Sequence, residues 1–132
     1  MPNIPIGTKG ESTILVTDEN AVNFLGVEGT RVLGTSYMIA YLEMTARDSV
    51  KPLLEAGFDT VGAQVNVRHL AATPMGMRVT FRSELTAAED RRLHFKVEAF
   101  DEKEKIGEGT HERAIINVAR FAARLQSKAA TP

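Results

Sequence analysis

Three polar residues have the types and the spacing that acyl transfer uses. Thr35 stands at the start of a long helical pattern, Glu43 lies about two turns into it, and His69 falls on a strand predicted after the helix. A hydroxyl, a carboxylate and an imidazole can supply a nucleophile, a base and an orienting group. The spacing predicts that these side chains face one cavity. There water, Thr35 or Glu43 would attack, and His69 would move a proton or steady the carboxylate.

Each of these residues also fits an ordinary structural role. Glu43 could form an exposed ion pair with Arg47, one turn later, worth about 0.3–0.5 kcal/mol. His69 could be a hydrogen-bonded core residue, and Thr35 or Ser36 could cap the helix by accepting a backbone N–H. The functional interpretation is a general base or nucleophile at Glu43, a proton carrier at His69, and a hydroxyl at Thr35 where helix amides favour negative charge.

One long helix must position Thr35 and Glu43. Hydrophobic periodicity predicts this helix over residues 37–54, with Pro52 loosening its last turns and Gly57 ending it. The apolar face predicted for it consists of Met38, Ile39, Leu42, Ala46, Val50 and Leu53. Glu43 lies on the flank of this face, where an unpaired charge would be unfavourable, so its presence there needs a reason.

Short strands make up most of the remaining chain. After the helix the apolar pattern changes to a period of two. This alternation predicts one row of side chains formed by Val61, Ala63, Val65, Val67 and His69. The predicted strands run over about 11–17, 60–69, 77–88, 93–99 and 106–118. Short helices are predicted over 18–25, before Gly26 and Gly29, and over 120–127.

This order of elements predicts an α+β fold in a single domain over residues 1–132. Residues 1–10 are expected to form an irregular N-terminal segment and residues 120–132 a tail. Short turns between the later strands favour antiparallel neighbours, so the simplest assembly is one central helix wrapped by a curved antiparallel β-sheet. Such a sheet leaves a long edge and an exposed face, which predicts pairing with a second copy of the chain.

The composition excludes several classes of function. The formal net charge is −1, so no broad basic surface is expected for nucleic acid or for an anionic membrane. Cysteine is absent, which excludes disulfides, thiolate catalysis and Cys-ligated metals. No apolar run approaches the roughly 20 residues of a membrane span, and residues 1–5 lack a secretory pattern, so a cytoplasmic protein is expected. His69, His94 and His111 form no local metal-ligand motif, so no metal or cofactor is expected.

An ordered set of short stretches points to a known family. They are VLGTSYMI at 32–39, LE at 42–43, VG at 61–62, VRHLAA at 67–72 and GEGTHER at 107–113. In this order and spacing the chain resembles the hotdog-fold acyl-CoA thioesterases, in particular the fluoroacetyl-CoA thioesterase family. The resemblance covers roughly residues 30–125 and implies a hotdog fold, in which one long helix is wrapped by a curved antiparallel sheet.

The resemblance also implies roles for five residues. The residues at the positions of Thr35, Glu43 and His69 form the catalytic set of the family, and those at Gly62 and Arg113 lie against the substrate. Two of these positions have structural alternatives. Gly62 could mark a β-bulge or close packing under the helix, and Arg113 could simply form an ion pair with a neighbouring glutamate, Glu108 or Glu112.

The function expected from these features is hydrolysis of a short-chain acyl-CoA thioester to the free acid and CoA, by a homodimer or larger homo-oligomer. The family's fluoroacetyl-selective members carry aromatic residues just ahead of the central helix, whereas residues 27–31 contain none. Two alternatives remain open. One is a hotdog hydratase or dehydratase that acts on acyl thioesters, and the other is a non-catalytic module that binds acyl-CoA or another small ligand.

Overall fold

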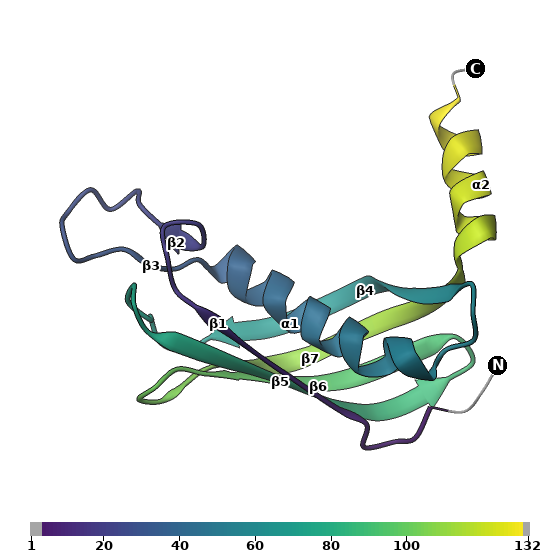
Figure 1. Ribbon diagram of the computed structural model, residues 1–132, viewed down its shortest axis with the longest axis horizontal. Coiled ribbons are helices and arrows are strands. Elements are labelled where there is room, and N and C mark those ends of the chain that lie inside the picture. Colours follow the sequence, from purple (N-terminus) through teal and green to yellow (C-terminus); the bar gives the residue numbers. More distant parts are fainter. Residues whose placement is uncertain (1–3, 131–132) are drawn as a thin grey trace.

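One long helix lies across one face of a curved antiparallel sheet in the computed structural model, which describes residues 4–130 (Figure 1). The helix, α1, spans Thr35–Val50, and the sheet has five strands. This arrangement confirms the predicted α+β class and the hotdog fold. Residues 1–3 of the expected N-terminal segment and residues 131–132 of the expected tail lie outside the described residues.

The sheet follows the order β1-β5-β6-β7-β4, and every neighbouring pair is antiparallel. Its strands are β1 (Lys9–Leu15), β4 (Phe58–His69), β5 (Arg78–Glu89), β6 (Arg92–Phe100) and β7 (Lys105–Asn117). A separate two-stranded ribbon pairs β2 (Ala21–Val22) with β3 (Val32–Leu33) just before α1. The strand that follows the helix, β4, is therefore an edge of the sheet, and one side of its backbone has no partner strand within residues 4–130.

The core lies between α1 and the face of the sheet that this helix covers. The buried apolar residues of α1 are Met38, Leu42, Ala46 and Val50. The strands that α1 covers contribute Val79, Phe81, Leu85, Leu93, Phe95, Val97, Ala99, Ile106 and Ile115. Each large apolar side chain removed from water contributes about 1.5–3 kcal/mol. Burial of this single face fixes how α1 is turned about its axis, and hence where Thr35 and Glu43 point.

The ends of α1 differ from the prediction over residues 37–54. The helix begins at Thr35, and at Val50 it gives way to a short 3₁₀ turn, η1 (Lys51–Leu53). Pro52 lies in that turn, and its ring has no N–H with which to continue the α-helical hydrogen bonds. Leu53 was predicted on the core face and is 39% exposed, because the change to 3₁₀ geometry turns it away from the sheet.

The short helix predicted over residues 18–25 is absent. Asn20 instead closes a turn: its side-chain oxygen accepts the backbone N–H of Thr17 at 2.8 Å, and its side-chain amide donates to the Leu15 carbonyl. The same amide also donates to the Tyr41 hydroxyl of α1 at 3.1 Å. Polar side chains that could cap a helix here bond locally to the backbone, and this competes with helix formation.

The apolar row predicted on β4 is interrupted by a β-bulge between Gly62 and Gln64. Before the bulge, Thr60 and Gly62 face α1. After it, Val65, Val67 and His69 do so. Ala63 is the extra residue, and a single insertion of this kind reverses the alternation of the strand. The prediction that Val61 and Ala63 share a face with His69 is therefore wrong, whereas the orientation predicted for His69 is correct.

A second helix, α2 (Val118–Ala129), follows β7 and projects away from the sheet (Figure 1). It extends the helix predicted over residues 120–127 by about a turn. The side chain of Asn117 caps its first turn by accepting the backbone N–H of Arg120 at 3.0 Å. Within residues 4–130, neither α-helix has the length and apolar character needed to cross a membrane.

Candidate functional site

A hydroxyl–imidazole pair lies at the start of α1. The Thr35 Oγ1 atom is 2.8 Å from Nδ1 of His69, which stands at the end of β4. Thr35 was predicted as a possible helix cap, but it does not cap α1. The N-cap residue is Gly34, which has no side chain to accept a hydrogen bond, and the first turn contains no acidic residue. Its amide groups therefore keep their partial positive charge at the place where the pair lies.

The pair opens onto a pocket of about 560 Å³. The pocket is lined by residues 32–36 and 69–72, together with Val22 and Phe24. Its wall is mostly apolar, and its side chains that can exchange a proton are the hydroxyls of Thr35 and Ser36 and the imidazole of His69. An apolar cavity with a few convergent polar groups is typical of a small-molecule binding site.

His69 is suited to act as a neutral base. Burial lowers the pKa of its imidazole below the ordinary value of 6.5, so the ring is largely uncharged at neutral pH. Its second nitrogen, Nε2, is buried and forms no hydrogen bond with any residue in 4–130. One nitrogen thus contacts a hydroxyl, and the other is a buried polar atom with no hydrogen-bond partner among residues 4–130.

Glu43 lies further along α1, against a different part of β4. Its side chain is 35% exposed, and its carboxylate covers Gly62 so closely that a Cβ atom built on Gly62 would lie 2.7 Å from Oε2. The absence of a side chain at Gly62 therefore makes the room that the carboxylate occupies. Both structural alternatives for Gly62 are observed, since it stands beside a β-bulge and packs under the helix.

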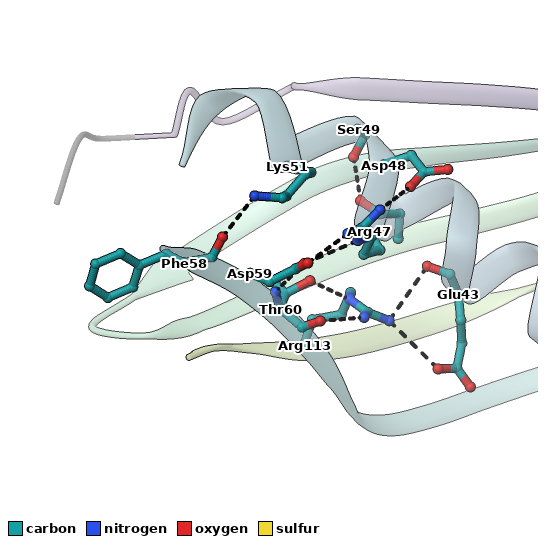
Figure 2. A network of polar contacts seen from close by, with 10 residues as sticks. Glu43, Arg47, Asp48, Ser49, Lys51, Phe58, Asp59, Thr60 and Arg113 are labelled. Atoms are coloured by element: carbon teal, nitrogen blue, oxygen red, sulfur yellow. Dashed lines mark hydrogen bonds and ion pairs between the residues drawn. The ribbon is translucent and has the colours of Figure 1, made fainter. Parts of the chain in front are cut away.

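The partner of Glu43 is Arg113 and not Arg47. Figure 2 shows Arg113 reaching from β7 toward α1, with its Nη1 atom 3.6 Å from the Glu43 carboxylate and 3.5 Å from the Glu43 carbonyl oxygen. Its Nε donates to the Thr60 hydroxyl at 2.7 Å and its Nη2 to the Thr60 carbonyl at 2.9 Å. The Arg113 side chain is only 6% exposed, so this fork of donors holds a buried cation directly beside Glu43.

Arg47 belongs to a neighbouring ion pair. It donates two hydrogen bonds to the carboxylate of Asp59, at 3.0 and 2.6 Å, and one to Asp48 (Figure 2). These bonds to Arg47 hold the pKa of Asp59 below its ordinary value. The ion pair connects the last turn of α1 to the start of β4 and so helps to fix Glu43 above Gly62.

The structure thus brings the five predicted residues into two separate groups. Thr35 contacts His69, and Glu43 contacts Gly62 and Arg113. Thr35 and Glu43 are separated by about 12 Å along the helix axis, at about 1.5 Å per residue. The single cavity predicted for Thr35, Glu43 and His69 is therefore not formed within one chain.

Two residues in the second group were not predicted from the sequence. Thr60 and His111 are both buried and both bind Arg113. The signal for His111 was present, because it alternates with Arg113 and Ile115 on the inward face of β7. Among residues 4–130, no group of three or more histidine or acidic side chains is placed to hold a metal ion.

The arrangement and the sequence agree with one family of enzymes. Residues 16–119 match the family FlK, described as fluoroacetyl-CoA-specific thioesterase. A curated relative, the fluoroacetyl-CoA thioesterase of Streptantibioticus cattleyicolor, is 40% identical over 101 residues, which cover 76% of this chain and 73% of the relative.

Solved structures give the same result for the fold. A structure of the fluoroacetyl-CoA thioesterase FlK superposes with a TM-score of 0.87 at 34% identity and covers 98% of this chain and 99% of that one. A hot-dog-like protein from Thermanaerovibrio acidaminovorans has a TM-score of 0.87 at 22% identity and covers 97% of this chain and 95% of that one. At that identity the second match bears on the fold alone.

Proposed function

The chain belongs to the fluoroacetyl-CoA-specific thioesterase family, and we propose that it hydrolyses short-chain acyl-CoA thioesters to the free acid and CoA. The observation that carries the proposal is the contact of 2.8 Å between the Thr35 hydroxyl and Nδ1 of His69 in a mostly apolar pocket. A hydroxyl bound to a neutral imidazole is the arrangement that activates an oxygen nucleophile.

In the proposed reaction, the oxygen of Thr35 attacks the thioester carbonyl carbon while His69 accepts the hydroxyl proton. The C–S bond then breaks, the proton passes to the CoA sulfur, and the acyl group remains on Thr35 as an ester. Water then attacks the ester carbonyl carbon while His69 accepts its proton. The bond from the acyl carbon to the Thr35 oxygen breaks, the proton passes from His69 to that oxygen, and the acid is released. Uncapped amides at the start of α1 favour the negative charge that develops on the carbonyl oxygen.

We further propose that Glu43 joins this pocket from a second protomer. Two features support a homodimer. One side of the edge strand β4, whose residues Gly62, Ala63 and Gln64 are exposed, pairs with no strand among residues 4–130, and α1 exposes two large apolar side chains, Tyr37 and Met44. Because these two residues lie two turns apart on one side of α1, a partner can cover them together. The Glu43 carboxylate would then stabilise the positive charge that His69 gains from Thr35.

The first test measures thiol release from acetyl-, fluoroacetyl- and crotonyl-CoA with the wild-type chain, together with loss of the enoyl absorbance of crotonyl-CoA. Hydrolysis predicts thiol release that depends on protein concentration, most rapid with the two short acyl groups. Loss of the enoyl absorbance without thiol would instead identify a hydratase. Saturable binding without either reaction would identify a binding module.

The second test assigns the residues. Glu43→Gln is expected to lower kcat by roughly 10²–10⁴-fold, the usual contribution of an acid–base group, while the protein stays folded. Mass spectrometry of a rapidly quenched reaction is expected to place the acyl group on Thr35, and an acyl group on Glu43 would refute the assigned nucleophile. A monomer by analytical ultracentrifugation at assay concentration that keeps full activity would refute the shared site.

A further inference from the structure

A buried imidazole on β7 has no part in the proposed reaction. His111 is 3% exposed and lies between two strands, opposite Val65 of β4 and Phe95 of β6. Its ring stacks on that of Phe95, with 6.2 Å between the ring centroids. Its Cε1 atom is 3.5 Å from the position that a Cβ atom on Gly62 would take, so the ring borders the space beneath Glu43.

The hydrogen bonds of His111 determine which nitrogen carries its proton. Nδ1 is 2.8 Å from the carbonyl oxygen of Gln64, which can only accept, so Nδ1 bears the hydrogen. Nε2 is 3.2 Å from Nη1 of Arg113, which can only donate, so Nε2 presents its lone pair. Both contacts are satisfied by one species alone, the neutral Nδ1–H tautomer.

We propose that His111, as this neutral tautomer, is a positioning residue that directs Arg113 at the carboxylate of Glu43. The inference rests on the proposed function, because it gives Glu43 a part in hydrolysis. Nη1 of Arg113 is the atom that His111 and Glu43 share. With one of its two hydrogens bound to His111, Nη1 directs the other toward Glu43, whose main-chain carbonyl accepts it at 3.5 Å and whose carboxylate lies 3.6 Å from Nη1.

The same ring also holds the strand beneath Glu43. Gln64 directly follows the bulge residue Ala63, so the bond from Nδ1 of His111 to the Gln64 carbonyl fixes the bulge that presents Gly62. His111 thereby positions both the Arg113 guanidinium beside the Glu43 carboxylate and Gly62 beneath it.

Protonation of His111 would disrupt this arrangement. The charged groups that face the ring are Arg113 from β7 and Glu43 from α1, while β6 presents the uncharged ring of Phe95 and β4 the carbonyl of Gln64. An imidazolium has no lone pair for Nη1 and repels the guanidinium. Burial, and to a smaller extent the charge of Arg113, lowers the pKa of His111, which keeps the ring neutral under ordinary conditions.

The first experiment reads the tautomer directly, in the full-length chain and without any assay of activity. Nitrogen-15 NMR of the imidazole rings at pH 7 is expected to show one histidine in the Nδ1–H form, and His111→Gln is expected to remove that signal. On acidification, the Arg113 Nε resonance is expected to move at the same midpoint as the His111 ring. The proposal would be overturned if the His111 ring is in the Nε2–H form or is cationic at pH 7. It would also be overturned if the Arg113 Nε resonance does not change at the midpoint of the His111 titration.

The second experiment separates the two hydrogen bonds of His111. In His111→Asn the amide can replace Nδ1 and donate to Gln64, but Arg113 loses its acceptor. In His111→Gln the longer side chain can replace Nε2 and accept from Arg113 at every pH. We expect His111→Asn to lower kcat about tenfold or more with little change in KM, as for a small misplacement of a catalytic group. His111→Gln is expected to keep most of kcat.

The matched control is His94→Gln on the neighbouring strand β6. His94 is 38% exposed and contacts Glu112, outside the Arg113 network, so this variant is expected to match the wild type in kcat, KM and pH profile. If the wild type hydrolyses acyl-CoA and both His111 variants match it, the positioning role is refuted. If the wild type hydrolyses no acyl-CoA while NMR finds the Nδ1–H ring coupled to Arg113, the proposed function alone has failed.

Discussion

The two polar groups along α1 differ in how completely their atoms are bonded. The Thr35–His69 pair opens onto a pocket, shares a single hydrogen bond and leaves Nε2 of His69 without a partner in residues 4–130. Arg113, in contrast, is buried, donates to Thr60, His111 and the Glu43 carbonyl, and forms an ion pair with the Glu43 carboxylate. A group with an unpartnered ring nitrogen can change its protonation at little structural cost, whereas a fully bonded cation resists movement. The first arrangement suits proton transfer and the second suits holding a carboxylate in place.

The largest expected effect is a loss of kcat when the Thr35–His69 pair is disrupted. His69→Ala removes the proposed base, which contacts Thr35, and is expected to lower kcat by roughly 10²–10⁴-fold. Because Nε2 of His69 bonds to nothing in residues 4–130, the free energy of unfolding is expected to fall by only about 1 kcal/mol. Steady-state kinetics and urea unfolding measure the two quantities. A loss of stability as large as the loss of transition-state stabilisation would contradict the assignment of His69 to chemistry.

In the second group, which contains Arg113, substitution is expected to lower the stability of the fold more than a substitution at His69 does. Arg113→Leu leaves the buried acceptors around it without a donor and is expected to lower the free energy of unfolding by about 3 kcal/mol. The control is Arg92→Leu, because Arg92 is 59% exposed and forms an ion pair with Glu112 at the surface. That exposed pair is worth about 0–1 kcal/mol. Equal destabilisation by the two substitutions, measured by urea unfolding, would argue against a structural network at Arg113.

Gly62→Ala sharpens the comparison, because it moves Glu43 without removing any hydrogen-bonding group. The added Cβ would lie 2.7 Å from Oε2 of Glu43, and the flexible end of that side chain can turn away. We therefore expect a change of less than about 1 kcal/mol in stability and a fall in kcat of about tenfold. Unchanged kcat in a folded Gly62→Ala protein would show that the position of this carboxylate does not limit the reaction.

The smallest effect is a dependence of stability on pH. Burial lowers the pKa of His69 and of His111 below the ordinary value of 6.5. As pH falls below about 6.5, the unfolded chain binds protons that the folded chain resists, so stability decreases there and is unaffected at higher pH. Urea unfolding at about pH 7.5 and about pH 5.5 should show this decrease, and His69→Gln should reduce it. A stability that rises on acidification over this window would contradict the lowered pKa values.

Much of the fold was predictable because burial imposes a period on the sequence. The alternation on β5, β6 and β7 and the apolar face of α1 located these elements to within a few residues. The bulge at Ala63 was not predictable, since Val61, Ala63 and Val65 continue an unbroken apolar alternation across it. The turn at Asn20 was missed because the same residue types cap helices and close turns.

For the site, the sequence predicted the residues better than their grouping. Thr35 and His69 lie in contact as predicted, but spacing along the chain does not reveal that Glu43 turns toward Gly62 and Arg113. The prediction that Thr35 caps the helix was wrong, because its hydroxyl contacts Nδ1 of His69. The role of His111 depends on a hydrogen bond across strands, which no local pattern encodes.

The bulge in β4 constrains how this protein can be altered. Ala63 is exposed, so many substitutions there should be neutral. Removing the residue altogether would instead rotate one half of the strand by half a turn, because side chains alternate with a period of two. Either Gly62 would leave the helix side or His69 would leave Thr35. The length of the chain between these two positions therefore matters more to the site than the side chain at Ala63, and a relative that lacks one residue here is expected to lack one of the two groups.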